Sequence, residues 1–93
     1  MIRSFRDRRT ETIWAGRPSR GLSVEIQNVA LRKLRMLNRA ETLDDLRVPP
    51  GNRLEMLKGD RRAAYLIRIN DQWRICFAWR EGGASDVEIV DYH

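Results

Sequence analysis

The alternation of apolar and polar side chains between Trp73 and Arg80 constrains the fold more than any other stretch. Apolar residues occupy every second position, and they are Trp73, Ile75, Phe77 and Trp79. The positions between them hold Arg74, Cys76, Ala78 and Arg80. Successive side chains of a strand point to opposite faces, so this period of two predicts a strand with one face in a core. Arg74 should leave the sheet on the other face, where we look for chemistry.

The neighbouring sequence predicts further strands joined by short turns. The expected strands are Met1 to Phe5, Arg53 to Leu57, Ala63 to Ile69 and Val87 to Tyr92. The last four strands of the chain are linked by Lys58-Gly59-Asp60, Asn70-Asp71 and Glu81-Gly82-Gly83-Ala84. Connections of these lengths are typical of antiparallel hairpins.

The first half of the chain is predicted to be helical. Asp7 to Ala15 can form a short helix, and Gly16, Pro18 and Gly21 then break the pattern. The second helix is expected from Val24 to Asn38, with Ser23 as its N-cap. Its apolar stripe consists of Ile26, Ala30, Leu34 and Leu37, spaced as one helical face requires. Its cations, among them Lys33, gather near the C-terminal end, where they favour the helix dipole.

Residues 40–51 form the linker between the helices and the hairpins. Leu43 and Leu46 are expected to cover a core edge, and Pro49-Pro50-Gly51 should stop any regular element. Helices followed by hairpins indicate an α+β fold. We expect an N-terminal helical hairpin packed on a twisted, mainly antiparallel sheet of four to five strands. Residues 1–93 are too few for a second core, so we expect a single domain.

The charge balance points to a polyanionic partner. The chain carries 18 basic and 13 acidic side chains, for a net charge of +5, and 16 of the basic residues are arginine. The guanidinium fork grips phosphate through two parallel hydrogen bonds, so this bias suits nucleic acid. A genomic base composition that favours arginine codons explains the same bias.

Composition argues against several other classes. The chain has one cysteine, Cys76, and one histidine, so we expect no internal disulfide, no zinc site and no cofactor. The first residues, MIRSFRDRRT, lack an apolar signal region, and no long apolar run follows. We therefore expect a protein of the reducing cytoplasm that does not contact a membrane.

Three clusters carry residues with chemical potential. They are the turn Lys58-Gly59-Asp60-Arg61-Arg62, Arg74 with Arg68 on the neighbouring strand, and the terminal Asp91-Tyr92-His93. Taken singly, these are an ordinary polar turn, exposed strand positions and a chain end. Taken together, they could cleave RNA without a metal, using the 2′-OH of the substrate as nucleophile. His93 would serve as base or acid, Arg74 and Lys58 would stabilise the phosphorane charge, and Tyr92 would stack on an unpaired base.

The runs VPPGNRLEMLKGDR, IRINDQWRICF and VEIVDYH closely resemble the HigB-type toxins of bacterial toxin–antitoxin modules. These toxins belong to the RelE/ParE superfamily, and the resemblance covers practically the whole chain. It implies a RelE-like fold and ribosome-dependent cleavage of mRNA in the A site. It also implies a helix-turn-helix antitoxin of the HigA type as partner.

The resemblance places the functional residues of the family on matching positions of this chain. It implies catalytic roles for Lys58, Arg74, Asp91, Tyr92 and His93. We expect Arg61, Arg68, Asn70, Gln72 and Glu55 to contact substrate. One departure concerns the strand before the LKGDR run, where some relatives have a histidine and this chain has Leu54-Glu55-Met56. Glu55 is then either a weaker base or a group that disfavours bound phosphate.

Two other functions remain open at the level of sequence. Members of the ParE branch share the fold and inhibit DNA gyrase by binding it, in which case the site residues are incidental. A weakened toxin would act mainly as an antitoxin-binding module. A candidate antitoxin contact is apolar surface on the helical hairpin around Ile13, Trp14 and Leu31, which core packing of the same residues would explain equally well.

Overall fold

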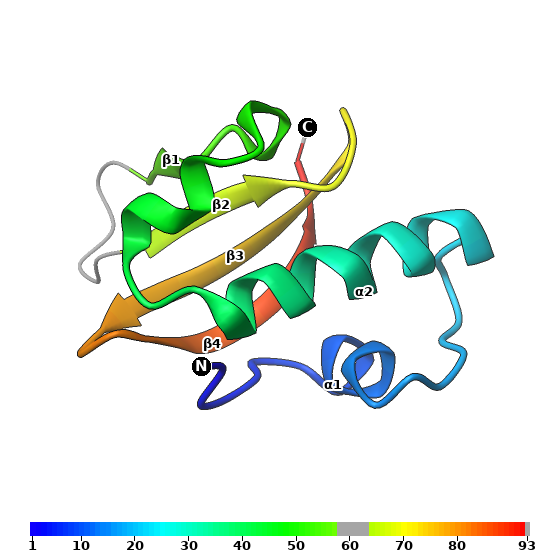
Figure 1. Ribbon diagram of the computed structural model, residues 1–93. Helices are drawn as coiled ribbons and strands as arrows, with labels where there is room; N and C mark the ends of the chain where they lie inside the picture. Colours follow the sequence, from blue (N-terminus) through cyan, green and yellow to red (C-terminus); the bar gives the residue numbers. More distant parts are fainter. Residues whose placement is uncertain (58–63, 93) are drawn as a thin grey trace.

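The computed structural model describes residues 1–57 and 64–92 of the chain. Two helices, α1 (Arg8–Trp14) and α2 (Val24–Arg39), precede two short 3-10 helices at Leu43–Arg47 and Pro50–Asn52. The strands are β1 (Glu55–Met56), β2 (Ala64–Arg68), β3 (Trp73–Arg80) and β4 (Gly83–Asp91). They form one sheet in the order β1-β2-β3-β4, and each neighbouring pair is antiparallel. The helices cover one face of this sheet, so the predicted α+β architecture is confirmed (Figure 1).

Side-chain caps set the start of each helix. Asp7 Oδ1 accepts a hydrogen bond from the backbone N–H of Thr10 at 2.8 Å, and Ser23 Oγ accepts one from Ile26 at 3.2 Å. Each satisfies a donor that the first helical turn leaves without an intrahelical partner. Between the helices Gly16 and Gly21 have positive φ values of 79° and 87°, which glycine adopts without steric cost. The predicted helical hairpin is confirmed.

The core lies between α2 and the inner face of the sheet. Ala30, Leu34 and Leu37 of α2 are fully buried together with Ile75, Phe77 and Ile89 of the strands. The aromatic stripe of β3 therefore faces the core as predicted, with Trp73 and Trp79 half-buried at its ends. In the predicted stripe of α2, Ala30, Leu34 and Leu37 are buried, and Ile26 is half-buried and packs against the core. Lys33, which the stripe did not include, is also buried.

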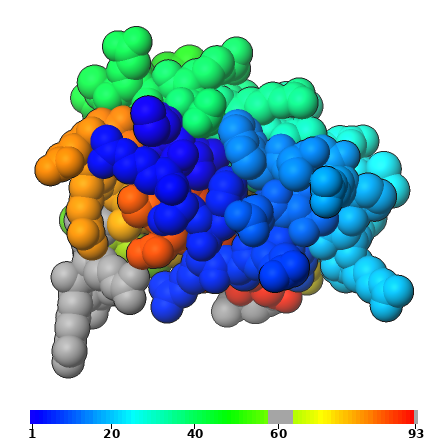
Figure 2. Space-filling model, turned by 90° about the horizontal axis from the view of Figure 1, so that it is seen from below, coloured from blue at the N-terminus to red at the C-terminus, as the bar shows by residue number. Residues whose placement is uncertain are grey.

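The first ten residues close the outer edge of β4. Ala84 exchanges backbone hydrogen bonds with Met1 and Arg3, and Val87 does so with Ser4 and Arg6, at 2.7 to 3.1 Å. Farther along β4, Ile89 donates to Thr10 Oγ1 at 2.9 Å and accepts from Arg9 Nη2 at 3.1 Å. Figure 2 shows this segment and α1 (dark to lighter blue) lying in front of β4. An edge strand of nine residues is thus not left open for pairing with another chain.

The predicted first strand, Met1 to Phe5, is present only as two isolated parallel bridges, Ile2 with Ala84 and Phe5 with Val87. The cause is a bulge in β4. Cys76 pairs with Glu88 and Ala78 pairs with Ser85, so two residues of β4 lie opposite the single residue Phe77. One of the two, Asp86, has a φ of 53°. A bulge of this kind kinks its strand, so a straight ladder cannot form along that edge.

Strand β4 begins at Gly83, four residues before the predicted start. The turn consists of Glu81 and Gly82 alone, with φ values of 50° and 71°. Two left-handed residues form the tight turn whose twist matches that of antiparallel strands. The prediction was wrong because the bulge at Asp86 breaks the alternation of apolar residues, so the pattern becomes regular only from Val87.

The linker contains more regular structure than expected. Pro50–Asn52 forms a 3-10 turn, so Pro49-Pro50-Gly51 does not stop every element there. The turn ends at Arg53, which has a left-handed backbone conformation (φ 47°, ψ 54°). This conformation shortens the predicted strand 53–57 to the two residues of β1. Leu46 is buried and Leu43 half-buried, which confirms their role at the core edge.

The contacts of Thr10 give the first prediction. Its side chain is fully buried, and replacing it with valine keeps the shape while removing the acceptor of the Ile89 N–H. A buried donor without an acceptor costs about 1–3 kcal/mol, so Thr10→Val should lower the free energy of unfolding by that amount. Urea denaturation measures it, with Thr12→Val in the same helix as control. An equal loss in both variants would show that the hydrogen bond is not responsible.

Candidate functional site

Two arginines face each other at one end of the sheet, on the side away from the helices. Arg68 on β2 and Arg74 on β3 are directly paired across the strands. Like charges in this arrangement repel one another, so local packing alone does not favour it. Glu55 pairs with Leu66, two residues from Arg68, and Arg74 pairs with Val90, two residues before Tyr92. The period of two therefore places Glu55, both arginines and Tyr92 on the same face.

The guanidinium of Arg74 is held from two sides. Its Nη1 donates to the backbone carbonyl of Asn70 and, at 3.2 Å, to that of Trp73. Its central carbon lies 4.7 Å from the centre of the Tyr92 ring, within the range of a cation–π interaction. Arg74 is therefore fixed in place, and no carboxylate is among its hydrogen-bond and ion-pair partners within residues 1–57 and 64–92.

Tyr92 joins the edge strand to the end of β4. Its backbone N–H donates to the carbonyl of Gln72 at 2.6 Å, and its hydroxyl donates to Glu55 Oε1 at 3.4 Å. The side chain remains exposed, with 41% of the residue's surface accessible. Tyr92 is thus anchored to the turn between β2 and β3, with one aromatic face on Arg74 and the hydroxyl on Glu55.

The turn between β2 and β3 is built around Asn70. Its side-chain oxygen accepts from the backbone N–H groups of Gln72 at 2.9 Å and Trp73 at 2.7 Å, an arrangement typical of asparagine turns. The side-chain amide of Gln72 donates to Asp91 Oδ2 at 3.2 Å. Asn70 and Gln72 therefore support the site in this structure, because they fix the backbone that holds Arg74 and the end of β4.

Asp71 lies at the same turn and was not singled out from the sequence. Its carboxylate accepts from Arg68 Nη2 at 2.6 Å. The pKa of Asp71 is lowered, first by this hydrogen bond and the charge of Arg68, and further by the charges of Arg53 and Arg74. Three arginines therefore act on one exposed carboxylate. Arg68 Nε is buried and has no hydrogen-bond partner within residues 1–57 and 64–92.

A second polar cluster lies behind the linker. Lys33 is only 7% exposed, and its Nζ donates to Asn52 Oδ1, which is fully buried. Asn52 Nδ2 in turn donates to the carbonyls of Leu46 at 3.1 Å and Val48 at 3.4 Å. Burial lowers the pKa of Lys33, and the charges of Arg32 and Arg68 lower it further. Sequence spacing gave no signal for this pair, because its members lie 19 residues apart.

The structure thus brings the described site residues to one end of the sheet: Glu55, Arg68, Asn70, Gln72, Arg74, Asp91 and Tyr92. Lys58, Arg61 and His93 lie outside the described residues. Within the described ranges no group of three or more histidine, cysteine, aspartate or glutamate side chains is arranged to hold a metal ion. In the same ranges no helix has the length and apolarity required to cross a bilayer.

Comparison with known proteins identifies the family of this chain. The family model described as a RelE-like toxin of type II toxin–antitoxin system HigB matches residues 3–93. The chain belongs to the HigB-like toxin family. It is similar to Toxin HigB-1 of Vibrio cholerae, at 38% identity over 90% of each chain. It is also similar to an uncharacterized protein of Haemophilus influenzae, at 34% identity over 67% of this chain and 61% of the relative.

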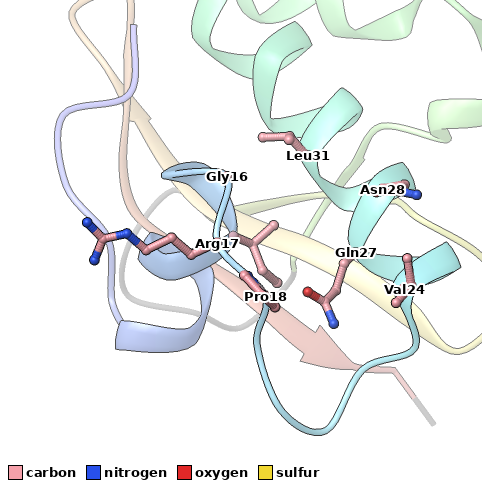
Figure 3. Close-up of a pocket in the computed structure, with 8 residues that line it drawn as sticks. Gly16, Arg17, Pro18, Val24, Gln27, Asn28 and Leu31 are labelled. Carbon is pink, nitrogen blue, oxygen red and sulfur yellow. The ribbon is translucent and has the colours of Figure 1, made fainter.

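Membership of the HigB-like family makes this protein a toxin of a type II toxin–antitoxin system, so an antitoxin is its partner. A surface groove of about 300 Å³ lies between the turn after α1 and the first half of α2. Its apolar lining comes mainly from Ile13, Pro18, Val24 and Leu31. Figure 3 shows Pro18 on one side of the groove and Val24 and Gln27 on the other. Trp14 does not line it and packs against Phe5, with ring centres 6.4 Å apart.

One acidic group of this HigB-like protein also lies on the outer sheet face. Glu88 pairs with Cys76, and its carboxylate is 3.3 Å from Arg6 Nε. Burial raises the pKa of Glu88 despite the neighbouring arginine, and the charges of Asp7 and Asp86 act in the same direction as burial. Because the folded state holds the proton more tightly than the unfolded state, Glu88 stabilises the fold below its unfolded pKa. That contribution disappears as the pH rises through its folded pKa.

Replacing Glu88 with glutamine should therefore have a pH-dependent effect. At pH 7 the variant avoids burying a carboxylate charge, so its melting temperature should exceed that of the wild type. Below about pH 4, where the wild-type group is protonated, the two proteins should melt alike. Thermal unfolding at both pH values tests this, with Glu81→Gln at an exposed turn position as control. A variant that is less stable at pH 7 would show that the Arg6 ion pair outweighs burial.

Proposed function

We propose that this toxin is a metal-independent endoribonuclease that cleaves translated mRNA in the ribosomal A site. The observation that carries the proposal is the Arg68–Arg74 pair beside the exposed ring of Tyr92. Arg74, whose described partners include no carboxylate, and Arg68, which shares its charge with Asp71, can bind phosphate oxygens. The adjacent aromatic face of Tyr92 can stack on an unpaired base. Membership of a family of RelE-like toxins supports the proposal, which places the protein's action in the cytoplasm, where translating ribosomes are found.

The proposed chemistry uses a nucleophile from the substrate. A base removes the proton of the ribose 2′-OH, and the resulting oxygen attacks the adjacent phosphorus. The bond from phosphorus to the 5′-oxygen breaks, and an acid supplies a proton to the leaving oxygen. The products are a 2′,3′-cyclic phosphate and a 5′-hydroxyl. Negative charge grows on the phosphoryl oxygens in the transition state, so fixed cations at that position accelerate the reaction.

Arg74 is best placed to stabilise that charge, because the carbonyls of Asn70 and Trp73 fix its guanidinium in advance of substrate binding. Tyr92 would hold a splayed base. Glu55, hydrogen-bonded to Tyr92, is a base candidate among the described residues. The roles of Lys58 as charge stabiliser and of His93 as acid or base rest on the resemblance to HigB-type toxins. The ribosome would supply much of the substrate positioning, which explains how so few groups suffice.

We propose further that the groove between α1 and α2 receives the antitoxin, a helix-turn-helix protein of the HigA type. The hairpin from Arg8 to Arg39 carries eight basic side chains against two acidic ones. Its charge therefore complements an acidic partner segment, and the aliphatic groove suits an apolar side chain of that segment. An RNA partner would match the charge but would not use a groove lined by Ile13, Val24 and Leu31.

Mapping of mRNA 5′-ends after brief expression tests the nuclease. The wild-type chain should cut within translated codons, and the cuts should vanish when translation is blocked. Arg74→Ala should reduce cleavage at least about 100-fold, because a fixed cation is lost from the transition state. Arg80→Ala provides a matched control, since Arg80 is an exposed arginine on the same strand and the same face.

The other functions predict different outcomes of the same experiment. Intact mRNA with stalled replication would replace the nuclease with a gyrase-binding toxin. Intact mRNA without growth arrest would leave only an antitoxin-binding module. Full cleavage by Arg74→Ala would keep the nuclease but show that the assigned site is wrong.

The antitoxin groove can be tested through Val24, whose residue surface is 73% exposed at its rim. Val24→Glu should weaken antitoxin binding at least tenfold, or by about 1.4 kcal/mol, because the glutamate removes an apolar contact and repels an acidic segment. Calorimetric titration with the cognate antitoxin measures the affinity. Val48→Glu is the matched control, because Val48 is also 73% exposed and lies on the linker. Equal affinities of both variants would place the interface elsewhere.

A further inference from the structure

A third arginine lies beside the proposed active site, although the sequence patterns gave no reason to select it. Arg53 is the residue at which the second 3-10 turn ends, two residues before β1. The pairing of Glu55 with Leu66 and of Met56 with Tyr65 runs antiparallel. Arg53 itself has a left-handed backbone and lies outside this ladder, directly after the turn Pro50–Asn52, which packs against β2. Three arginines, Arg53, Arg68 and Arg74, therefore lie on three neighbouring segments of chain.

The electrostatics of Asp71 support this arrangement independently. Its pKa is lowered by the charge of Arg53 as well as by those of Arg68 and Arg74, so all three act on one carboxylate. That carboxylate bonds only to Arg68 among the described residues. Arg53 is exposed, and its guanidinium has no hydrogen bond or ion pair within residues 1–57 and 64–92. Its charge is therefore available to a ligand.

The backbone of Arg53 is held in a conformation that arginine does not favour. Its φ of 47° lies in the left-handed region, which residues with a Cβ atom other than asparagine and aspartate rarely enter. The preceding residue, Asn52, is fully buried, and its side chain binds the carbonyls of Leu46 and Val48 and the ammonium of Lys33. Unfavourable backbone conformations persist where the surrounding structure fixes them, and they often accompany function.

We propose that Arg53 is a further phosphate-binding residue of the RNA site, and that the buried Lys33–Asn52 hydrogen bond positions it. The inference rests on the proposed function for its ligand, a single-stranded RNA. Neighbouring strands lie about 4.8 Å apart, and the three arginines come from three neighbouring segments, so together they contact more than one phosphate of the RNA strand. Arg53 precedes β1, which β2 separates from β3 and Arg74, so Arg53 binds a phosphate away from the reacting one.

Replacing Arg53 with glycine separates binding from stability. Glycine adopts the left-handed conformation without steric cost, so Arg53→Gly should melt at the wild-type temperature or above it. Affinity for a single-stranded RNA with 2′-O-methyl groups, which cannot be cleaved by this chemistry, should fall about tenfold at 0.1 M salt. The slope of log affinity against log salt should become shallower by about 0.7, as expected for one lost phosphate contact. Fluorescence anisotropy measures both quantities.

Arg20→Gly is the matched control. It removes the same charge from an exposed position in the turn between the helices, so it should leave the salt slope unchanged. Equal losses of affinity in the two variants, wild-type binding by Arg53→Gly, or no RNA binding by the wild-type chain would overturn the inference. Arg53-dependent binding without cleavage of translated mRNA would remove the nuclease and keep the binding site. Cleavage of mRNA with no effect of Arg53→Gly on RNA binding would keep the nuclease and remove the binding site at Arg53.

The positioning role of Lys33 requires a separate measurement, because Lys33→Met also changes the stability of the linker. If Lys33 acts through Arg53, Lys33→Met should weaken RNA binding in the wild-type background and have no further effect when combined with Arg53→Gly. Additive losses would show that Lys33 acts independently, and would overturn its positioning role. Where Lys33→Met does not fold, Lys33→Gln, which keeps a hydrogen-bond donor, takes its place in the same cycle.

Discussion

The outer edge of β4 has to be paired, and the rest of the fold follows from how residues 1–10 pair it. Three β4 residues, Ala84, Val87 and Ile89, satisfy their outward backbone groups with this segment. The last of these contacts come from α1 itself, so closing the edge also fixes the helix against the sheet. The turn after α1 then returns the chain as α2, whose apolar residues complete the core. An open edge of this length would be a site for aggregation.

The proposed site lies at the end of the sheet that holds the turn between β2 and β3. Trp73 links the core to the proposed site. On the core side, Arg9 of α1 lies 5.3 Å from the centre of the Trp73 ring. The next residue, Arg74, faces outward. The carbonyl of Trp73 also accepts a hydrogen bond from Arg74. Packing on one face of β3 thus sets the backbone from which the catalytic candidate projects on the other. A site on a packed strand holds its groups more precisely than one on a loop.

The sequence predicts those features that depend on residues close together in the chain, and it does not predict those that depend on distant partners. Strand β3 was predicted to the residue, because its alternation is regular from Trp73 to Arg80. The start of β4 was missed, since the bulge at Asp86 adds a residue and breaks the period of two. The burial of Lys33 depends on Asn52, a partner distant in sequence, and no periodicity encodes such a contact. Arg53 was missed because the order of apolar and polar side chains does not indicate its left-handed backbone conformation.

Lys33 and Arg74 are held by neutral partners within the described residues. A carboxylate in place of Asn52 would pair with Lys33 and neutralise it, whereas the amide oxygen satisfies the ammonium without cancelling its charge. Arg74 is likewise held by carbonyls and an aromatic ring. Neutral acceptors thus fix the side-chain orientations of Lys33 and Arg74. Lys33 loses hydration because it is buried, and the paired arginines repel each other, so both features cost stability. Under the proposed function, the arginines would bind phosphate groups of the RNA, and local stability would be given up for that binding.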